Sequence, residues 1–330
     1  MVNKHYFAPS QVNGNVALIK SLKKMGINFY SGITGGGVAH FLTSLSPYAG
    51  FSQKKNSRPS FLTILEYISG FIPIGYYLAS GKISASITTT GAAIKLASCG
   101  MNDAKLHNIP AVYLVPLNPK NSKGLAPMQD VSSDGMNIIP QLKAELGDGC
   151  VVINSIKGMA GQLKRAQKIL SESRPVAIAF YPDILTKAED VKVGIYKIQN
   201  FQKTNEKDLN KDLNKFLITA KNKKIVIFVG EEAARSKNIQ KLTTQFAELL
   251  QAPTVWSING INAVSHENNY GYGQILFGGN DKSIELWKNI KKDGDYVIIM
   301  LGFDPGEFIL NFEKIRASYV WHFTNFKKPY

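Results

Sequence analysis

The chain has 330 residues, which is enough for two domains of ordinary size. Apolar residues make up 44% of it and charged residues 19%, a composition that excludes an intrinsically disordered chain. The formal net charge is +15, but the basic residues are scattered and no nucleic-acid motif accompanies them. We therefore expect no nucleic-acid partner.

The first half of the chain alternates between helical periodicity and short β-branched runs. Val16, Leu18 and Leu22 recur at helical spacing before Gly26, which predicts a helix that ends there. The expected elements are a helix over 15–24, a strand over 27–30, a glycine loop over 32–37, helices over 38–45 and 61–79, a strand over 83–88, a helix over 93–104, strands over 111–115 and 151–153, a helix over 159–171 and a strand over 176–181.

This alternation predicts an α/β fold with a parallel sheet that is covered on both faces. We expect a first domain over 1–185 and a charge-rich linker over 186–218. A second, Rossmann-like domain over 219–330 follows, with strands over 224–229, 254–257 and 296–301 and a helix over 238–250. The predicted architecture is two doubly wound parallel-sheet domains.

Cysteine content and hydropathy indicate the compartment. Cys99 and Cys150 are too few for a disulfide framework and lack zinc spacing, and the start of the chain has no signal-peptide pattern. The segment 61–80 carries one charge, Glu66, but Pro73 and two glycines interrupt it. We expect a cytoplasmic protein without a membrane span.

Glu66 is the first candidate for chemistry, because its neighbours are apolar. Leu62, Leu65, Tyr67 and Ile68 leave this helix little polar surface, so Glu66 is expected in or beside an apolar interior. Burial without a counter-charge raises the pKa of a carboxyl group and suits one that must share a proton.

The order of several short motifs resembles the first domain of acetolactate synthase-like thiamine-diphosphate enzymes. The matching segments are Gly32–Gly37, Leu65–Tyr67 with Gly75–Lys82, Thr88–Ala93, Gly100–Ala104 with Asn108–Pro110, Met128–Asp130, and Arg174–Val176 with Tyr181–Asp183. Their order and spacing, more than any one of them, carry the resemblance. Residues 219–330 resemble the central Rossmann-like domain of the same family.

The resemblance implies a cofactor, thiamine diphosphate with Mg²⁺, and a 2-keto acid substrate. In the family, the glutamate at the position of Glu66 hydrogen-bonds N1′ of the aminopyrimidine ring and promotes loss of the thiazolium C2 proton. The other positions implied are Gln129 facing the reacting centre, Thr90, Gly91 and Asn102 at the cofactor, and Gly35, Gly36 and Gly37 at the entrance.

Two departures leave the type of activity open. The family loop usually reads Gly-Pro-Gly where this chain has Gly91-Ala92-Ala93, and His40 and His107 do not match the histidines of the decarboxylases. Both decarboxylation and carboligation therefore remain open. A non-catalytic assembly module of the same fold is an alternative.

The family domain that holds the diphosphate and the metal is not found in the sequence. Gly147-Asp148-Gly149 resembles part of its signature, but the Asn268-Asn269 pair lies too far away, so we interpret 147–149 as a turn. The chain is then a fragment, a subunit that is completed by another, or a form that does not turn over. We expect no metal ligands within it, and we expect association as a homo-oligomer (dimer or tetramer) or with a partner subunit.

Nucleotide binding has two possible places. Some central domains of the family bind a flavin or adenine nucleotide after their first strand, but Glu231 and Glu232 would repel a pyrophosphate there. The alternative of an NADP-binding oxidoreductase would use the glycine loop over 32–37, with the basic segment 53–58 at the 2′-phosphate.

Overall fold

The computed structural model describes residues 13–45, 61–122, 124–187, 206–275, 278–304, 306–307 and 316–326. The chain divides into two compact units, Met1–Phe201 and Gln202–Tyr330, so that the division lies within the predicted linker. Each unit is an α/β domain built on a parallel sheet, as the sequence predicts.

The sheet of the first unit has six parallel strands in the described residues, in the order β2-β1-β3-β4-β6-β5. The strands are β1 (Tyr30–Gly32), β2 (Phe61–Thr63), β3 (Ala85–Ile87), β4 (Val112–Pro116), β5 (Cys150–Ile153) and β6 (Val176–Phe180). The central strands β3, β4 and β6 are buried along their whole length, because helices cover both faces of the sheet.

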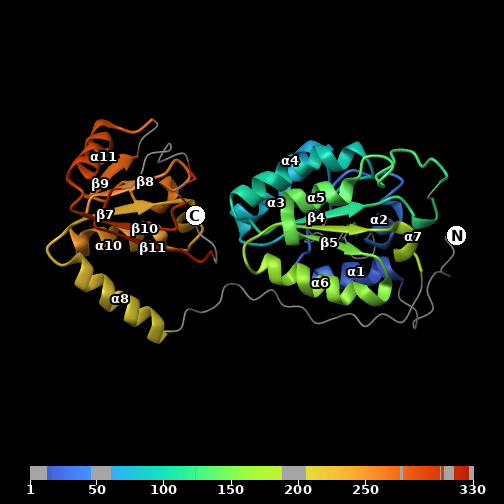
Figure 1. Cartoon of the computed structure of the whole chain (residues 1–330), viewed down its shortest axis with the longest axis horizontal. Helices are drawn as coiled ribbons and strands as arrows, with labels where there is room; N and C mark the ends of the chain where they lie inside the picture. The colour runs from blue at the N-terminus through green and yellow to red at the C-terminus, as the bar shows by residue number, and fades with distance from the viewer. Residues whose placement is uncertain are drawn as a thin grey trace, which may run out of the picture. The chain divides into compact units, whose positions relative to one another are not determined.

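Helices lie on both faces of this sheet (Figure 1). One face carries α1 (Gly14–Lys24), α2 (Ala39–Leu45) and α6 (Ile156–Leu170); the other carries α3 (Glu66–Ser80), α4 (Ala92–Leu106) and α5 (Ile138–Leu146), and the short α7 (Pro182–Leu185) follows β6. The Asn13 side chain caps α1 by accepting a hydrogen bond from the Val16 N–H at 3.0 Å.

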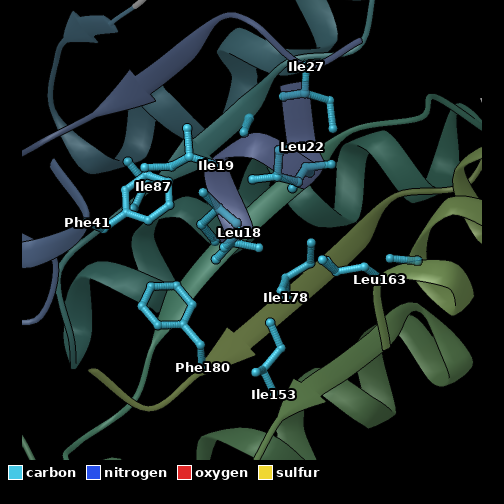
Figure 2. Packing of buried hydrophobic residues seen from close by; sticks show 14 of the residues in the cluster. Leu18, Ile19, Leu22, Ile27, Phe41, Ile87, Ile153, Leu163, Ile178 and Phe180 are labelled. Atoms are coloured by element: carbon cyan, nitrogen blue, oxygen red, sulfur yellow. The ribbon is translucent and has the colours of Figure 1, made fainter. Parts of the chain in front are cut away.

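The core beneath α1 shows why the predicted periodicity holds. Leu18, Ile19 and Leu22 recur at helical spacing and point into one apolar cluster with Phe41 and Phe180 (Figure 2). Each of these side chains is at most 2% exposed, so the face of α1 that the sequence marks as apolar is the face that packs on the sheet.

The prediction of one helix over 61–79 is wrong in its first turn. Phe61–Thr63 forms β2, which pairs in parallel with Tyr30–Gly32 at the sheet edge, and α3 begins at Glu66. The Ile64 N–H donates to the Gly32 carbonyl at 2.8 Å, which continues the pairing beyond the strand. An apolar run at this edge gains backbone hydrogen bonds as a strand, and its composition does not distinguish this from a helix.

The second unit has a five-stranded parallel sheet in the described residues, in the order β11-β10-β7-β8-β9. Its elements are α8 (Glu206–Ala220), β7 (Lys224–Val229), α9 (Glu231–Ala234), α10 (Ile239–Leu250), β8 (Thr254–Trp256), β9 (Gly271–Gln274), α11 (Asp281–Asp293), β10 (Tyr296–Leu301) and β11 (Tyr319–Phe323). Helix α11 covers one face, whereas α8 and α10 contribute to the core on the other.

Helix α8 occupies the last part of the predicted linker. Its Phe216 is buried and packs edge-on against Trp321 of β11, with the ring centroids 5.8 Å apart, so this helix belongs to the second domain. The charged residues that suggest a linker occupy the exposed side of the helix. Among the described residues, none of the helices is both long and apolar enough to cross a bilayer.

Candidate functional site

The strand order of the first sheet defines where a ligand can bind. The chain passes from β1 to β2 on one side and then crosses to β3 on the other side of β1. In open α/β sheets, ligands bind at such a switch point, outside the carboxyl ends of the strands. The loops after β1 and β3 flank this point, and the candidate residues 35–37 and 90–91 lie in those loops.

The glycine loop after β1 lies directly against the threonines after β3. A Cβ atom on Gly35 would lie 2.4 Å from the Thr89 Oγ1, and one on Gly37 would lie 2.2 Å from the Thr90 Oγ1. Both glycines are therefore required for this close approach. A Cβ on Gly36 would meet no heavy atom within 4 Å, so this glycine borders open space.

Gln129 lies directly against Gly91. A Cβ on Gly91 would lie 2.0 Å from the Gln129 Oε1, and Gly91 has a φ of 92°. Gln129 itself is exposed and has a φ of 54°, which is uncommon for a residue with a side chain. The loops after β3 and β4 thus meet at these two residues.

Glu66 is the first residue of α3 and is half-buried. A buried serine network ties this end of the helix to the sheet. The Ser69 hydroxyl donates to the Glu66 carbonyl at 2.8 Å and lies 3.1 Å from the Ser86 hydroxyl of β3. The Ser31 hydroxyl of β1 donates to the Ser69 carbonyl at 3.3 Å. No motif of the sequence marks these serines. The signal that could have identified Ser31 and Ser86 is their position within short buried strands, whereas Ser69 lies in α3.

The expectation that Glu66 lies in or beside an apolar interior needs correction. Its neighbours Leu65, Tyr67 and Ile68 are 63%, 52% and 43% exposed, so the apolar residues form a surface around the carboxylate. One reason is that the first turns of α3 approach the neighbouring helix through small residues. A Cβ on Gly70 would lie 2.4 Å from the Ala97 carbonyl oxygen of α4, so the larger side chains face outward.

Asn102 lies outside the group of candidate residues. It is exposed on α4, ten residues after the helix begins at Ala92, which is about 15 Å along the axis. The structure therefore brings five candidate residues together: Gly35, Gly37, Thr90, Gly91 and Gln129. Glu66 begins the helix that follows the neighbouring edge strand, β2. Asn102 is not brought to this group.

A pocket with a volume of about 440 Å³ lies beside Gln129, in the loop that follows β4. Its lining includes Asp130, Lys120 and Tyr181. The Lys120 ammonium donates to the Asn154 carbonyl at 3.0 Å and lies 4.9 Å from the centre of the Tyr181 ring. This is a volume suited to a small molecule.

The segment Gly147–Gly149 is a turn of 3₁₀ helix that leads into β5. Asp148 pairs with both terminal nitrogens of Arg174, and this hydrogen-bonded guanidinium lowers the pKa of the Asp148 carboxyl. Asp148 therefore has Arg174 as its partner in the fold. Among the described residues, no group of three or more His, Cys, Asp or Glu side chains is placed to hold a metal ion.

Arg174→Met is expected to lower stability slightly at neutral pH. A carboxyl whose pKa is lowered in the folded protein contributes stability above its unfolded pKa, and this contribution is lost as the pH falls through the folded value. Because both side chains are more than a third exposed, the effect is small. Urea unfolding of native and variant chains should differ more at pH 7 than at pH 3; a difference that grows on acidification would contradict this.

The described residues thus form two doubly wound parallel α/β domains, and the candidate residues lie at the switch point of the first. An X-ray structure from Mycobacterium smegmatis, of a protein assigned as a thiamin diphosphate-dependent enzyme, has a similar fold, with a TM-score of 0.69 and 14% sequence identity. The match covers 89% of this chain and 53% of that one, so this chain spans about half the length of its structural neighbour.

Comparison of the sequence alone does not assign the chain to a family. No family model matches the chain, and no curated protein matches it. At 14% identity, the likeness shows that the chain has the fold of this thiamin diphosphate-dependent enzyme. The basic segment 53–58, on which the NADP alternative depends, lies outside the described residues.

Proposed function

We propose that this chain is part of a thiamine-diphosphate-dependent enzyme, of the acetolactate synthase type, that acts on a 2-keto acid as a lyase, carboligase or decarboxylase. The observation that carries the proposal is the contact of three loops at the switch point of the first sheet. Gly35 and Gly37 contact the threonines after β3, and Gly91 contacts Gln129. The fold shared with the neighbouring structure supports it.

The residues at this edge fit the aminopyrimidine half of the cofactor. The Glu66 carboxylate is half-buried at the start of α3, on a helix end that the serine network fixes to β1 and β3, so it can hold and exchange a proton at a ring nitrogen. The loops at Thr90 and Gly36 would line the ring, and the exposed Gln129 would face the substrate. When bound, thiamine diphosphate supplies the carbon nucleophile and the electron sink for 2-keto acid chemistry.

We further propose that the groups that bind the diphosphate and Mg²⁺ lie outside these 330 residues, in a further domain or another subunit. The apolar residues around Glu66 support association at this face, since a contiguous apolar patch usually marks an interaction surface. Leu62, Leu65, Tyr67 and Ile68 are each at least 38% exposed. A homo-oligomer or a partner subunit would cover them.

Cofactor binding tests the proposal. The chain alone, and the same chain in its native assembly or any longer native form, would be titrated calorimetrically with thiamine diphosphate and Mg²⁺, followed by pyruvate turnover. We expect binding and turnover by the assembly and none by the isolated chain, because the diphosphate ligands are missing from it. If no form binds the cofactor, the non-catalytic assembly module becomes the better explanation.

A further inference from the structure

The second domain has its own switch point, between β7 and β10. The chain runs from β7 through β8 to β9 on one side, and then returns to β10 and β11 on the other side of β7. This is the place where a doubly wound sheet binds a nucleotide, with backbone N–H groups at the end of the first strand directed at its phosphates.

A carboxylate of the chain itself occupies this place. The Glu231 N–H, which follows β7, donates to both oxygens of Glu307, at 3.1 and 3.2 Å. The Asp304 N–H after β10 donates to the same carboxylate at 2.9 Å, and the Ser257 hydroxyl after β8 donates to it as well. Donors from the carboxyl ends of three neighbouring strands thus converge on one anion.

In the part of the chain that the structure describes, the backbone around Glu307 is closely packed. A Cβ on Gly230 would lie 2.2 Å from the Phe303 Cα and 2.8 Å from the Glu307 Oε1. Gly302, at the end of β10, has a φ of 53°, and a Cβ on it would lie 2.4 Å from the Ala233 nitrogen. The two loops that would separate around a pyrophosphate are in direct contact.

The two carboxylates of the loop after β7 have partners within the domain. Glu231 accepts hydrogen bonds from the Arg235 guanidinium at 2.7 Å and from the Asn259 amide at 3.0 Å. Glu232 accepts from the Thr324 hydroxyl and the Asn325 N–H, both at 2.7 Å, which ties α9 to the segment after β11. These contacts hold the loop after β7 against the loop after β10.

Burial raises the pKa of the Glu307 carboxyl, and the Glu231 carboxylate adds to this effect, whereas the hydrogen bonds from Ser257, Asp304 and the Glu231 backbone act against it. Protein donors have therefore replaced much of the solvent around this group. The geometry does not depend on the thiamine proposal, since it lies within the second domain.

We propose that Glu307 is the resident anion of the second switch point and that it closes this domain to phosphate-bearing ligands. The domain then serves as a structural module, and a phosphate-bearing ligand enters only when the Glu307 carboxylate leaves its donors. This assigns to Glu307 the role that a bound phosphate has in a nucleotide-binding domain of this topology.

Calorimetric titration with ADP and with inorganic phosphate tests the proposal on the full chain. The native chain should bind neither. Glu307→Ser removes the carboxylate and leaves the donors of Glu231, Asp304 and Ser257 in place. It should bind both probes, with affinities at least about tenfold above the detection limit that the native chain does not reach, because a half-buried like charge is removed. Its thermal unfolding midpoint should rise with phosphate concentration.

Glu248→Ser is the matched control, because Glu248 is an exposed glutamate of α10 in the same domain. It should leave binding unchanged. If Glu307→Ser does not fold, Glu307→Gln keeps the side-chain volume and should show the same gain in smaller measure. Binding of ADP by the native chain, or a folded Glu307 variant that gains no affinity for either probe, would overturn the proposal.

Discussion

Replacing Glu66 with glutamine is expected to reduce turnover of a 2-keto acid by the assembled enzyme by roughly 10²- to 10⁴-fold, the range of a lost general acid–base group. Glutamine keeps the size of the side chain but cannot exchange a proton with a ring nitrogen. The backbone at Glu66 is held by the Ser69 hydroxyl, which bonds the main-chain carbonyl, so the substitution should leave the helix end intact.

Three measurements separate this effect from damage to the fold. Thermal unfolding and cofactor affinity of Glu66→Gln should stay close to the native values, while turnover with pyruvate is lost. Glu172→Gln is the matched control: Glu172 is half-buried in the same domain but precedes β6, at the amino edge of the sheet. A Glu66→Gln enzyme that turns over at the native rate would refute the role of this carboxylate.

The elements that the sequence predicts well have a clear local pattern. The helix predicted over 15–24 is observed as α1, because its apolar residues recur at helical spacing, and the strand predicted over 224–229 is observed as β7, because it is a compact β-branched run. The run at 61–80 has no such period. Its first residues pair with β1 as β2, and only a partner strand distant in sequence determines this.

The candidate site shows a similar division. The motif order places the loops after β1, β3 and β4 at one edge of the sheet, which follows from a parallel topology. The contact of Gly91 with Gln129 depends on how two loops fold, and the exposure of the apolar residues beside Glu66 depends on which face of α3 packs on α4. The helix sequence marks its large apolar residues, but the buried face also contains the small residues Ser69 and Gly70.

Gly100→Ala is expected to destabilise the first domain by about 3 kcal/mol. The added methyl group would occupy the space in which α3 and α4 approach each other. A Cβ on Gly100 would lie 2.1 Å from the Gly70 carbonyl oxygen and 2.7 Å from the Phe71 nitrogen. These are backbone atoms, so the helices would have to separate, and part of the core that includes Ile74 and Met101 would be lost. Urea unfolding followed by helical circular dichroism measures the change.

Gly75→Ala, on the partner helix α3, is the matched control for this prediction. A Cβ on Gly75 would meet no heavy atom within 4 Å, and alanine favours a helix over glycine by about 1 kcal/mol. The control should therefore be neutral or more stable than the native chain. If Gly100→Ala were tolerated as well as Gly75→Ala, the close contact of α3 with α4 would be wrong, and with it the explanation for the apolar surface around Glu66.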